Sequence, residues 1–137
     1  MSTENQDFWP TDIAKVGIVA PATILNEQAS LLGKKTRGLV TAVVRTSSDE
    51  RWISHTLVLQ VPALANYTYA LLLVRQPVLI YPLRMQAFNK FYEIPTQEEF
   101  IAVLRAILSS DDTKRIIHAL LAQVLPPSTS KDDDVPL

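Results

Sequence analysis

The stretch Tyr67-Thr68-Tyr69-Ala70-Leu71-Leu72-Leu73-Val74 decides the fold that this sequence predicts. Its residue types favour an extended strand, and apolar side chains stand on both alternating faces along most of its length. A strand with one face in water should alternate between apolar and polar residues. The pattern therefore predicts a central strand that is covered on both sides.

Other strand-like runs flank this stretch, with no room between them for helices. Leu39–Arg45 and Trp52–Val61 precede it, and the short run Val78–Tyr81 follows it before Pro82. Successive strands joined by short turns pair with their neighbours, so the sequence predicts an antiparallel β-meander of three to four strands. In the second run, the face expected to point inward carries Ile53, His55, Leu57, Leu59 and Val61.

Helical patterns lie on both sides of these strands. Pro21 suits the first turn of a helix, and Gly33 stands where a left-handed cap would end it. Thr96 and the acidic residues after it match a capping box, and a second helix can begin directly afterwards at Ser110 or Asp111. The prediction is an α+β fold, with an N-terminal helix and a C-terminal helical hairpin packed on the sheet.

The chain has 137 residues, 47% of them hydrophobic, which suits one compact domain. We expect residues 1–125 to form a single α+β domain and residues 126–137 to form a disordered acidic tail. Near the start, Phe8 and Trp9 stand beside Pro10. We expect an arm tucked into the core; the alternative is an exposed hook for a partner, because aromatic residues dominate interface energetics.

The composition excludes several chemistries. The chain has no cysteine and therefore no disulfide, thiolate metal site or cysteine nucleophile. Its two histidines lie far apart in sequence, so we expect no metal site and no cofactor. A net charge of −1 gives no basic field for nucleic acid, and no run approaches the roughly 18 apolar residues of a membrane span. The polar, acidic start is unlike a signal peptide, so we expect a cytoplasmic protein.

Elimination favours a non-catalytic protein-interaction module, of accessory, adaptor or immunity type, over an enzyme. A central strand covered on both faces needs more cover than three helices provide, because two of them pair on one side. We expect a second copy to cover the remaining face in a homodimer, since two-fold self-association is the commonest solution. The expected interface residues are Trp52, Val58, Tyr81, Phe8 and Trp9.

Two alternatives remain open. The first is a small-ligand-binding or enzymatic domain with a pocket around His55, because an imidazole on an inward face needs a polar partner. Its other expected ligand-binding residues are Tyr67, Tyr69 and Arg75. The second is nucleic-acid binding, which requires one continuous basic face formed by Lys34, Lys35, Arg37 and Arg45.

Overall fold

The computed structural model describes residues 6–125 of the chain. Within them the fold is α+β, as predicted, with five strands rather than three to four. The predicted tail, 126–137, lies outside the described residues. In chain order the elements are α1 (Pro21–Lys35), β1 (Thr41–Ser48), β2 (Ile53–Val61), the short 3-10 helix η1 (Pro62–Leu64), β3 (Tyr67–Gln76), β4 (Leu83–Ala87), β5 (Lys90–Ile94), α2 (Gln97–Leu108) and α3 (Asp111–Val124).

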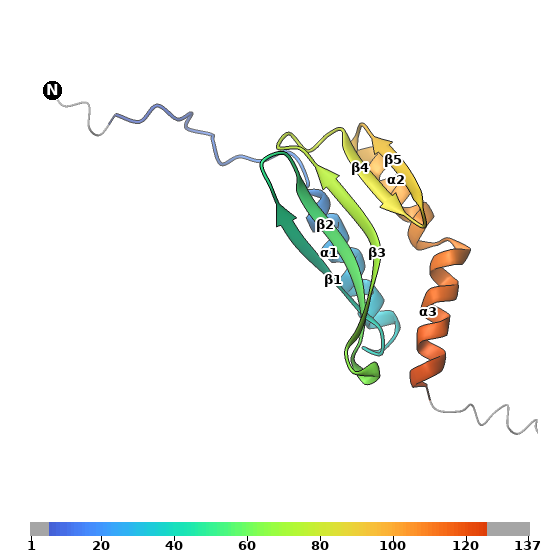
Figure 1. The fold of residues 1–137 in the computed structure, drawn as a ribbon. Coiled ribbons are helices and arrows are strands. Elements are labelled where there is room, and N and C mark those ends of the chain that lie inside the picture. The colour runs from blue at the N-terminus through green and yellow to red at the C-terminus, as the bar shows by residue number, and fades with distance from the viewer. Residues whose placement is uncertain (1–5, 126–137) are drawn as a thin grey trace, which may run out of the picture.

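The strands form one sheet whose spatial order, β1-β2-β3-β4-β5, repeats their order in sequence (Figure 1). Every neighbouring pair is antiparallel, so the predicted meander is confirmed. β3 pairs with β2 along its whole length but with β4 only over Leu73–Arg75. Between Leu57 and Val58 of β2, the register on β3 skips one residue, Leu71, which makes a β-bulge.

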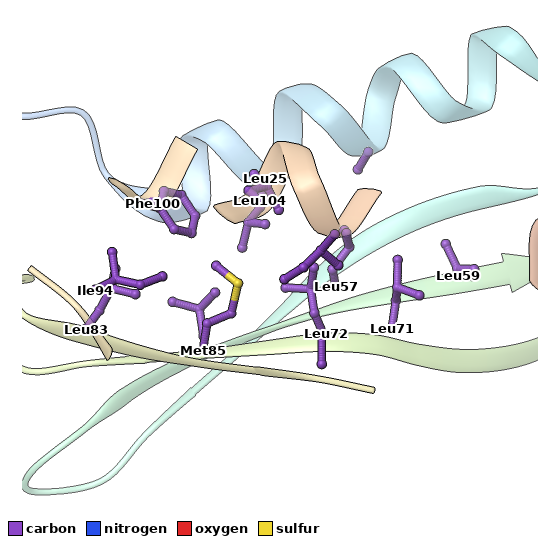
Figure 2. Packing of buried hydrophobic residues seen from close by; sticks show 14 of the residues in the cluster. Leu25, Leu57, Leu59, Leu71, Leu72, Leu83, Met85, Ile94, Phe100 and Leu104 are labelled. Carbon is purple, nitrogen blue, oxygen red and sulfur yellow. The ribbon is translucent and has the colours of Figure 1, made fainter. Parts of the chain in front are cut away.

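The helices lie on one side of the sheet, which gives a two-layer fold. In Figure 1, α1 lies behind β1, β2 and β3, and α2 lies behind β4 and β5. Figure 2 shows the core between these layers, where Leu25 of α1 and Phe100 of α2 stand over Leu83 and Met85 of β4. α3 adds Leu120 to the same core. We call the side of the sheet that faces the helices the covered side.

The prediction that residues 67–74 are covered on both sides was wrong. β3 is central in the sheet, but the helices cover only one of its faces, and Ala70 on the other face is exposed. The bulge is the physical reason. Leu71 and Leu72 both enter the core, where they are 5% and 3% exposed, so the run of three leucines does not alternate between two faces.

The prediction of a strand at Val78–Tyr81 was also wrong. This segment is the turn between β3 and β4, and the side chains of Val78 and Leu79 are exposed. Ile80 has a φ of 78°, and the amide of Tyr81 donates to the carbonyl oxygen of Leu79 over 2.9 Å. A β-branched residue in this left-handed region is rare, so the sequence gives little warning of the turn.

The fourth and fifth strands lie where the sequence pattern assigns no element. They form a hairpin whose two turn residues, Phe88 and Asn89, have φ of 51° and 64°. Positive φ at both positions is the geometry that matches the twist of a two-residue hairpin, and Asn89 is a residue type that tolerates it. The missed signal is the alternation of buried residues in β4 at Leu83, Met85 and Ala87.

The N-terminal helix begins at Pro21, as predicted, but it ends at Lys35 rather than at Gly33. The left-handed residues are Arg37 and Gly38, with φ of 56° and 79°. The amide of Gly38 donates to the carbonyl oxygen of Gly33 over 2.8 Å and so satisfies one of the last free carbonyl groups of the helix. The helix is therefore capped one turn later than the sequence pattern indicates.

Both predicted starts of the C-terminal helices are confirmed. The side chain of Thr96 accepts a hydrogen bond from the amide of Glu99 over 3.2 Å, and that of Ser110 accepts one from the amide of Thr113 over the same distance. Each bond satisfies one of the amides that a helix leaves free at its first turn. A short link joins α2 to α3. In Figure 1, α3 continues beyond the end of α2 instead of folding back beside it, so the two predicted helices are present but do not form a closely packed hairpin.

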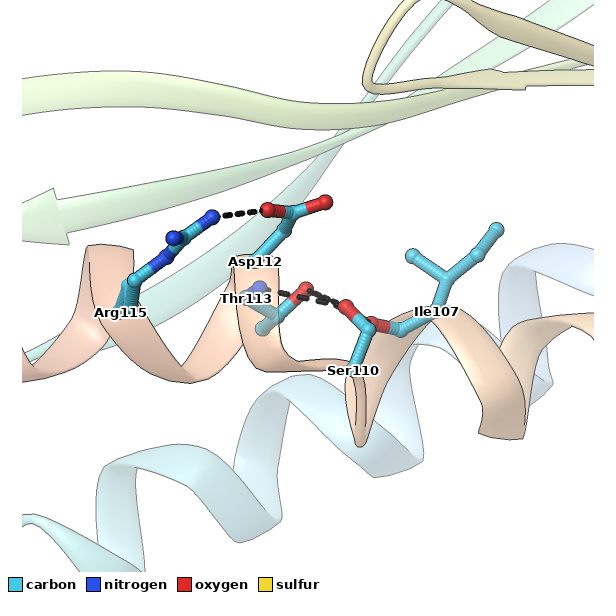
Figure 3. A network of polar contacts seen from close by, with 5 residues as sticks. All are labelled: Ile107, Ser110, Asp112, Thr113 and Arg115. Atoms are coloured by element: carbon cyan, nitrogen blue, oxygen red, sulfur yellow. Dashed lines mark hydrogen bonds and ion pairs between the residues drawn. The ribbon is translucent and has the colours of Figure 1, made fainter.

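A small polar network fixes the junction of α2 and α3 (Figure 3). The buried hydroxyl of Thr113 donates to the carbonyl oxygen of Ile107, at the end of α2, over 2.7 Å. On the exposed side of the same turn, Asp112 forms an ion pair with Arg115. An exposed ion pair contributes little to stability, so we attribute the fixed angle of this junction to the buried hydroxyl.

Candidate functional site

The helices leave one face of the sheet without cover, and we call it the open face. Side chains alternate between the two sides of a strand, so the registers assign each residue to a side. Val58 lies on the open face by this assignment. Its side chain is only 4% exposed, yet it does not belong to the core cluster between the sheet and the helices. Besides Val58, the residues of the open face that matter below are Val43, Arg45, Ala70, Leu73, Arg75, Arg84, Gln86, Phe91 and Glu93.

An apolar strip crosses the open face over three strands. Val43, Val58 and Ala70 are direct cross-strand partners, and Leu73 follows on β3. Val43 and Leu73 are half-buried, and neither of them belongs to the core cluster or packs against it. Val58 at the centre of the strip is buried by its neighbours, so the apolar side chains that meet water are those of Val43, Ala70 and Leu73. A contiguous apolar patch of this kind suits a partner.

One end of the open face carries an aromatic ring in contact with two cations. Trp52 directly precedes β2, and the guanidinium carbons of Arg75 and Arg84 each lie 5.3 Å from the centre of its ring. These two arginines are cross-strand partners on β3 and β4. Because a guanidinium group is attracted to an aromatic face, the pair holds the indole against the sheet.

The turn before Trp52 is fixed by a carboxylate. Oδ1 of Asp49 accepts hydrogen bonds from the amides of Arg51 and Trp52, each over 2.8 Å. The bond from Trp52 is the largest cause that lowers the pKa of Asp49, followed by the bond from Arg51. The group is therefore ionised at neutral pH and fixes the backbone that carries the indole.

A groove runs along the open face where β3 meets β4, and we call it the β3–β4 groove. It consists of two hollows of about 410 and 540 Å³, and Leu73 and Gln86 line both of them. Arg75, Arg84 and Phe91 line the first hollow. The second lies in the gap where the ladder between the strands has ended, and it is lined by Ala70 of the open face as well as by Leu71 and Leu72 of the covered side. The groove adds depth to a face that is otherwise a flat sheet.

The N-terminal arm, residues 6–19, is exposed at every position, so the prediction of an arm tucked into the core was wrong. The side chains of Phe8 and Trp9 are 84% and 72% exposed. In Figure 1 the arm leaves the start of α1 and extends away from the sheet and the helices. Proline at position 10 and glycine at position 17 interrupt regular structure, which is why the segment forms no helix or strand of its own.

The four residues of the predicted ligand pocket do not share one site. His55 lies on the covered side of β2 opposite Val74, whereas Tyr67 pairs with Val61 at the far end of the same ladder. Arg75 lies on the open face, beside Trp52. The fourth residue, Tyr69, lies near Tyr67 and packs at the edge of the core.

The predicted interface residues also lie in different places. Trp52 and Val58 are on the open face, and Phe8 and Trp9 are in the arm. Tyr81, by contrast, packs against the core, and its hydroxyl has no hydrogen-bond partner within residues 6–125. The sequence pattern gave no reason to single out Arg84, Gln86 or Phe91, because their strands were not predicted.

His55 is buried and has a polar partner, as its place on an inward face requires. Its Nδ1 lies 2.8 Å from the hydroxyl oxygen of Thr46 on β1. Burial lowers the pKa of His55 below its ordinary value of 6.5, and the nearby side chain of Gln76 opposes this only in part. The imidazole is therefore neutral at physiological pH and acts as a polar link between neighbouring strands.

The stability of the protein is expected to fall as the pH decreases below about 6.5. The unfolded chain takes up a proton at His55 before the folded chain does, so the stability present above that pH is lost as the pH approaches the lowered pKa. Urea unfolding at pH 7.5 and 5.5 measures the effect. His55→Gln should weaken the pH dependence, whereas the control His118→Gln, at an exposed histidine, should not. Equal pH dependence in His55→Gln and in the unmodified protein would contradict this assignment.

The basic residues considered for nucleic-acid binding do not belong to one element. Lys34 and Lys35 end α1 and Arg37 follows them, whereas Arg45 stands on the open face of β1. Within residues 6–125, acidic residues and histidines form no group of three that could hold a metal ion. Among the helices of this part of the chain, none combines the length and apolar character needed to cross a bilayer.

Comparison of the chain with protein-family models, with curated proteins and with solved structures finds no match to any of them.

Proposed function

We propose that this protein is a non-catalytic interaction module of the cytoplasm that associates with a second copy of itself through the open face of its sheet. The observation that carries the proposal is the apolar strip, because Val43, Val58 and Leu73 are apolar without belonging to the core. A sheet face that needs no partner carries polar residues at such positions. A two-fold axis would place the strip of one copy against the strip of the other.

The surroundings of the strip support binding rather than catalysis. Near the strip, Arg75 and Arg84 hold the ring of Trp52 against the sheet. Arginine and tryptophan are residue types that dominate interface energetics. Of the residues expected in a ligand pocket, His55 and Arg75 lie on opposite sides of the sheet, and Tyr67 lies at the other end of the ladder from His55. The open face thus offers apolar contact area and charged groups to a partner, while the imidazole of His55 lies on the covered side of the sheet.

Leu73→Arg is expected to weaken self-association by about 30-fold or more in Kd, the effect of losing one hot-spot residue. A two-fold interface would bring two added charges together over apolar surface, which is costly. Sedimentation equilibrium over a range of micromolar concentrations measures the Kd. Ala106→Arg is the matched control, because it adds the same charge at an exposed position of α2, on the far side of the molecule.

Two results would contradict the proposal. One is an unmodified chain that stays monomeric up to about 100 µM, since a standard interface of roughly 1,600 Å² binds more tightly than that. The other is a dimer whose Kd is the same in the Leu73→Arg variant as in the Ala106→Arg control.

A further inference from the structure

The arm carries apolar surface that its own copy does not cover. Besides Phe8 and Trp9, the side chains of Ile13, Val16 and Ile18 are more than half exposed. The hydrogen bonds of the arm join its own residues, as from the amide of Ile13 to Pro10 over 3.1 Å. A segment with this much exposed apolar surface marks a site of interaction.

We propose that the two copies exchange arms: the arm of each copy packs into the β3–β4 groove on the open face of the other. This inference rests on the proposed self-association and adds to it the segment that fills the groove. Every copy has one arm and one groove, so under the two-fold symmetry of the proposed dimer the exchange is reciprocal and closes at two copies.

The size of the contact fits a stable dimer. An aromatic side chain buries roughly 150–250 Å², so Phe8 and Trp9 together bury about 300–500 Å² of each arm. With two arms and two receiving grooves, the total reaches roughly 1,200–2,000 Å², the range of specific interfaces. The two hollows, about 410 and 540 Å³, give each aromatic side chain a site of its own.

The charges of the arm and the open face are complementary. Among residues 6–19 the arm carries Asp7 and Asp12 against one lysine, Lys15. The strands present the three arginines Arg45, Arg75 and Arg84 on the open face against one acidic residue, Glu93. Opposite net charge steers the arm to this face.

The arm also has the reach that the exchange requires. Fully extended, residues 6–19 span up to roughly 45 Å, whereas the ten residues of β3 span about 33 Å. The arm starts at α1, which lies on the covered side of its own sheet, and in Figure 1 it points away from that sheet. The arm must therefore pass the edge of its own sheet to reach the open face of the facing copy, and its extended length allows this.

A mixing experiment tests the exchange. One variant lacks residues 2–19 and keeps the groove; the other carries Leu73→Arg and keeps the arm. Each alone is expected to associate much more weakly than the unmodified chain by sedimentation, because neither combines an arm with an intact groove, while an equimolar mixture forms a 1:1 complex through the one remaining arm and groove. If the shortened chain dimerises as tightly as the unmodified chain and Leu73→Arg disrupts that dimer, the arm exchange fails and the proposed function stands. If neither change affects the dimer, or if the unmodified chain is monomeric, both fail.

Cross-linking distinguishes exchange from an arm that folds back on its own groove. The chain has no cysteine, so single cysteines can be introduced without side reactions. Copies with Thr11→Cys, mixed with copies with Gln86→Cys, should form a disulfide-linked pair on mild oxidation, and pairing with Ala106→Cys should not occur. A chain with Thr11→Cys and Gln86→Cys together that cross-links only within itself, at any concentration, would overturn the exchange.

Discussion

Arginine in place of Val74 is expected to unfold the protein, whereas arginine in place of its neighbour Leu73 is expected to leave the fold intact. Val74 is completely buried on the covered side of the central strand. An unpaired charge there costs several kcal/mol, which is comparable with the whole stability of a domain, roughly 5–15 kcal/mol. At Leu73, on the open face, the guanidinium group can reach water.

Circular dichroism and chemical denaturation of the two variants at equal concentration give the comparison. The expected result is a cooperative transition for Leu73→Arg and none for Val74→Arg. If both variants unfold, the face that carries Leu73 is not open; if both fold with similar midpoints, Val74 is not in the core. Either result would also remove the basis of the proposed interface.

Alanine in place of Phe100 is expected to lower the free energy of unfolding by about 3–5 kcal/mol, the usual cost of truncating a buried aromatic side chain. Phe100 is fully buried between α2 and the sheet (Figure 2). The matched control is Phe91→Ala, because this phenylalanine is 77% exposed on β5. Its truncation should change the stability of the monomer by at most about 0.5 kcal/mol.

Both variants should be compared in the Leu73→Arg background, because dimerisation would add a concentration-dependent contribution to stability. Urea denaturation followed by circular dichroism then reports the folding of one copy. Similar losses for Phe100→Ala and Phe91→Ala would contradict the arrangement of α2 over β4 and β5. In the unmodified background, Phe91→Ala should additionally weaken the dimer, since Phe91 lines the β3–β4 groove.

The sequence predicts the fold well where apolar and polar residues alternate strictly along a strand and where a capping residue starts a helix. The strand from Ile53 to Val61 places all its expected inward residues on the covered side, and the caps at Thr96 and Ser110 begin helices where predicted. The prediction fails at β3, because a bulge changes which side each later residue faces. Tyr67, Tyr69 and Arg75 share a side in a regular strand, but Leu71 shifts Arg75 to the opposite side.

The candidate site is harder to predict, because most of it depends on two short strands. β4 and β5 have five residues each, and the turn between them contains Phe88 rather than the glycine that usually marks such a hairpin. Arg84 and Gln86 were therefore not assigned to the face that they share with Trp52. The exposed position of Phe8 and Trp9 could not be predicted either, since aromatic residues beside a proline fit a buried arm equally well.

The bulge at Leu71 also has a consequence for the evolution of this chain. Removing that one residue would let both halves of β3 keep their present partners on β2, so every remaining side chain would stay on its side of the sheet. A strand interior usually does not tolerate insertions or deletions, because a shift by one residue moves every later side chain to the opposite face of the sheet. Here a relative one residue shorter could preserve the architecture, and sequence alignments should permit a gap inside this strand.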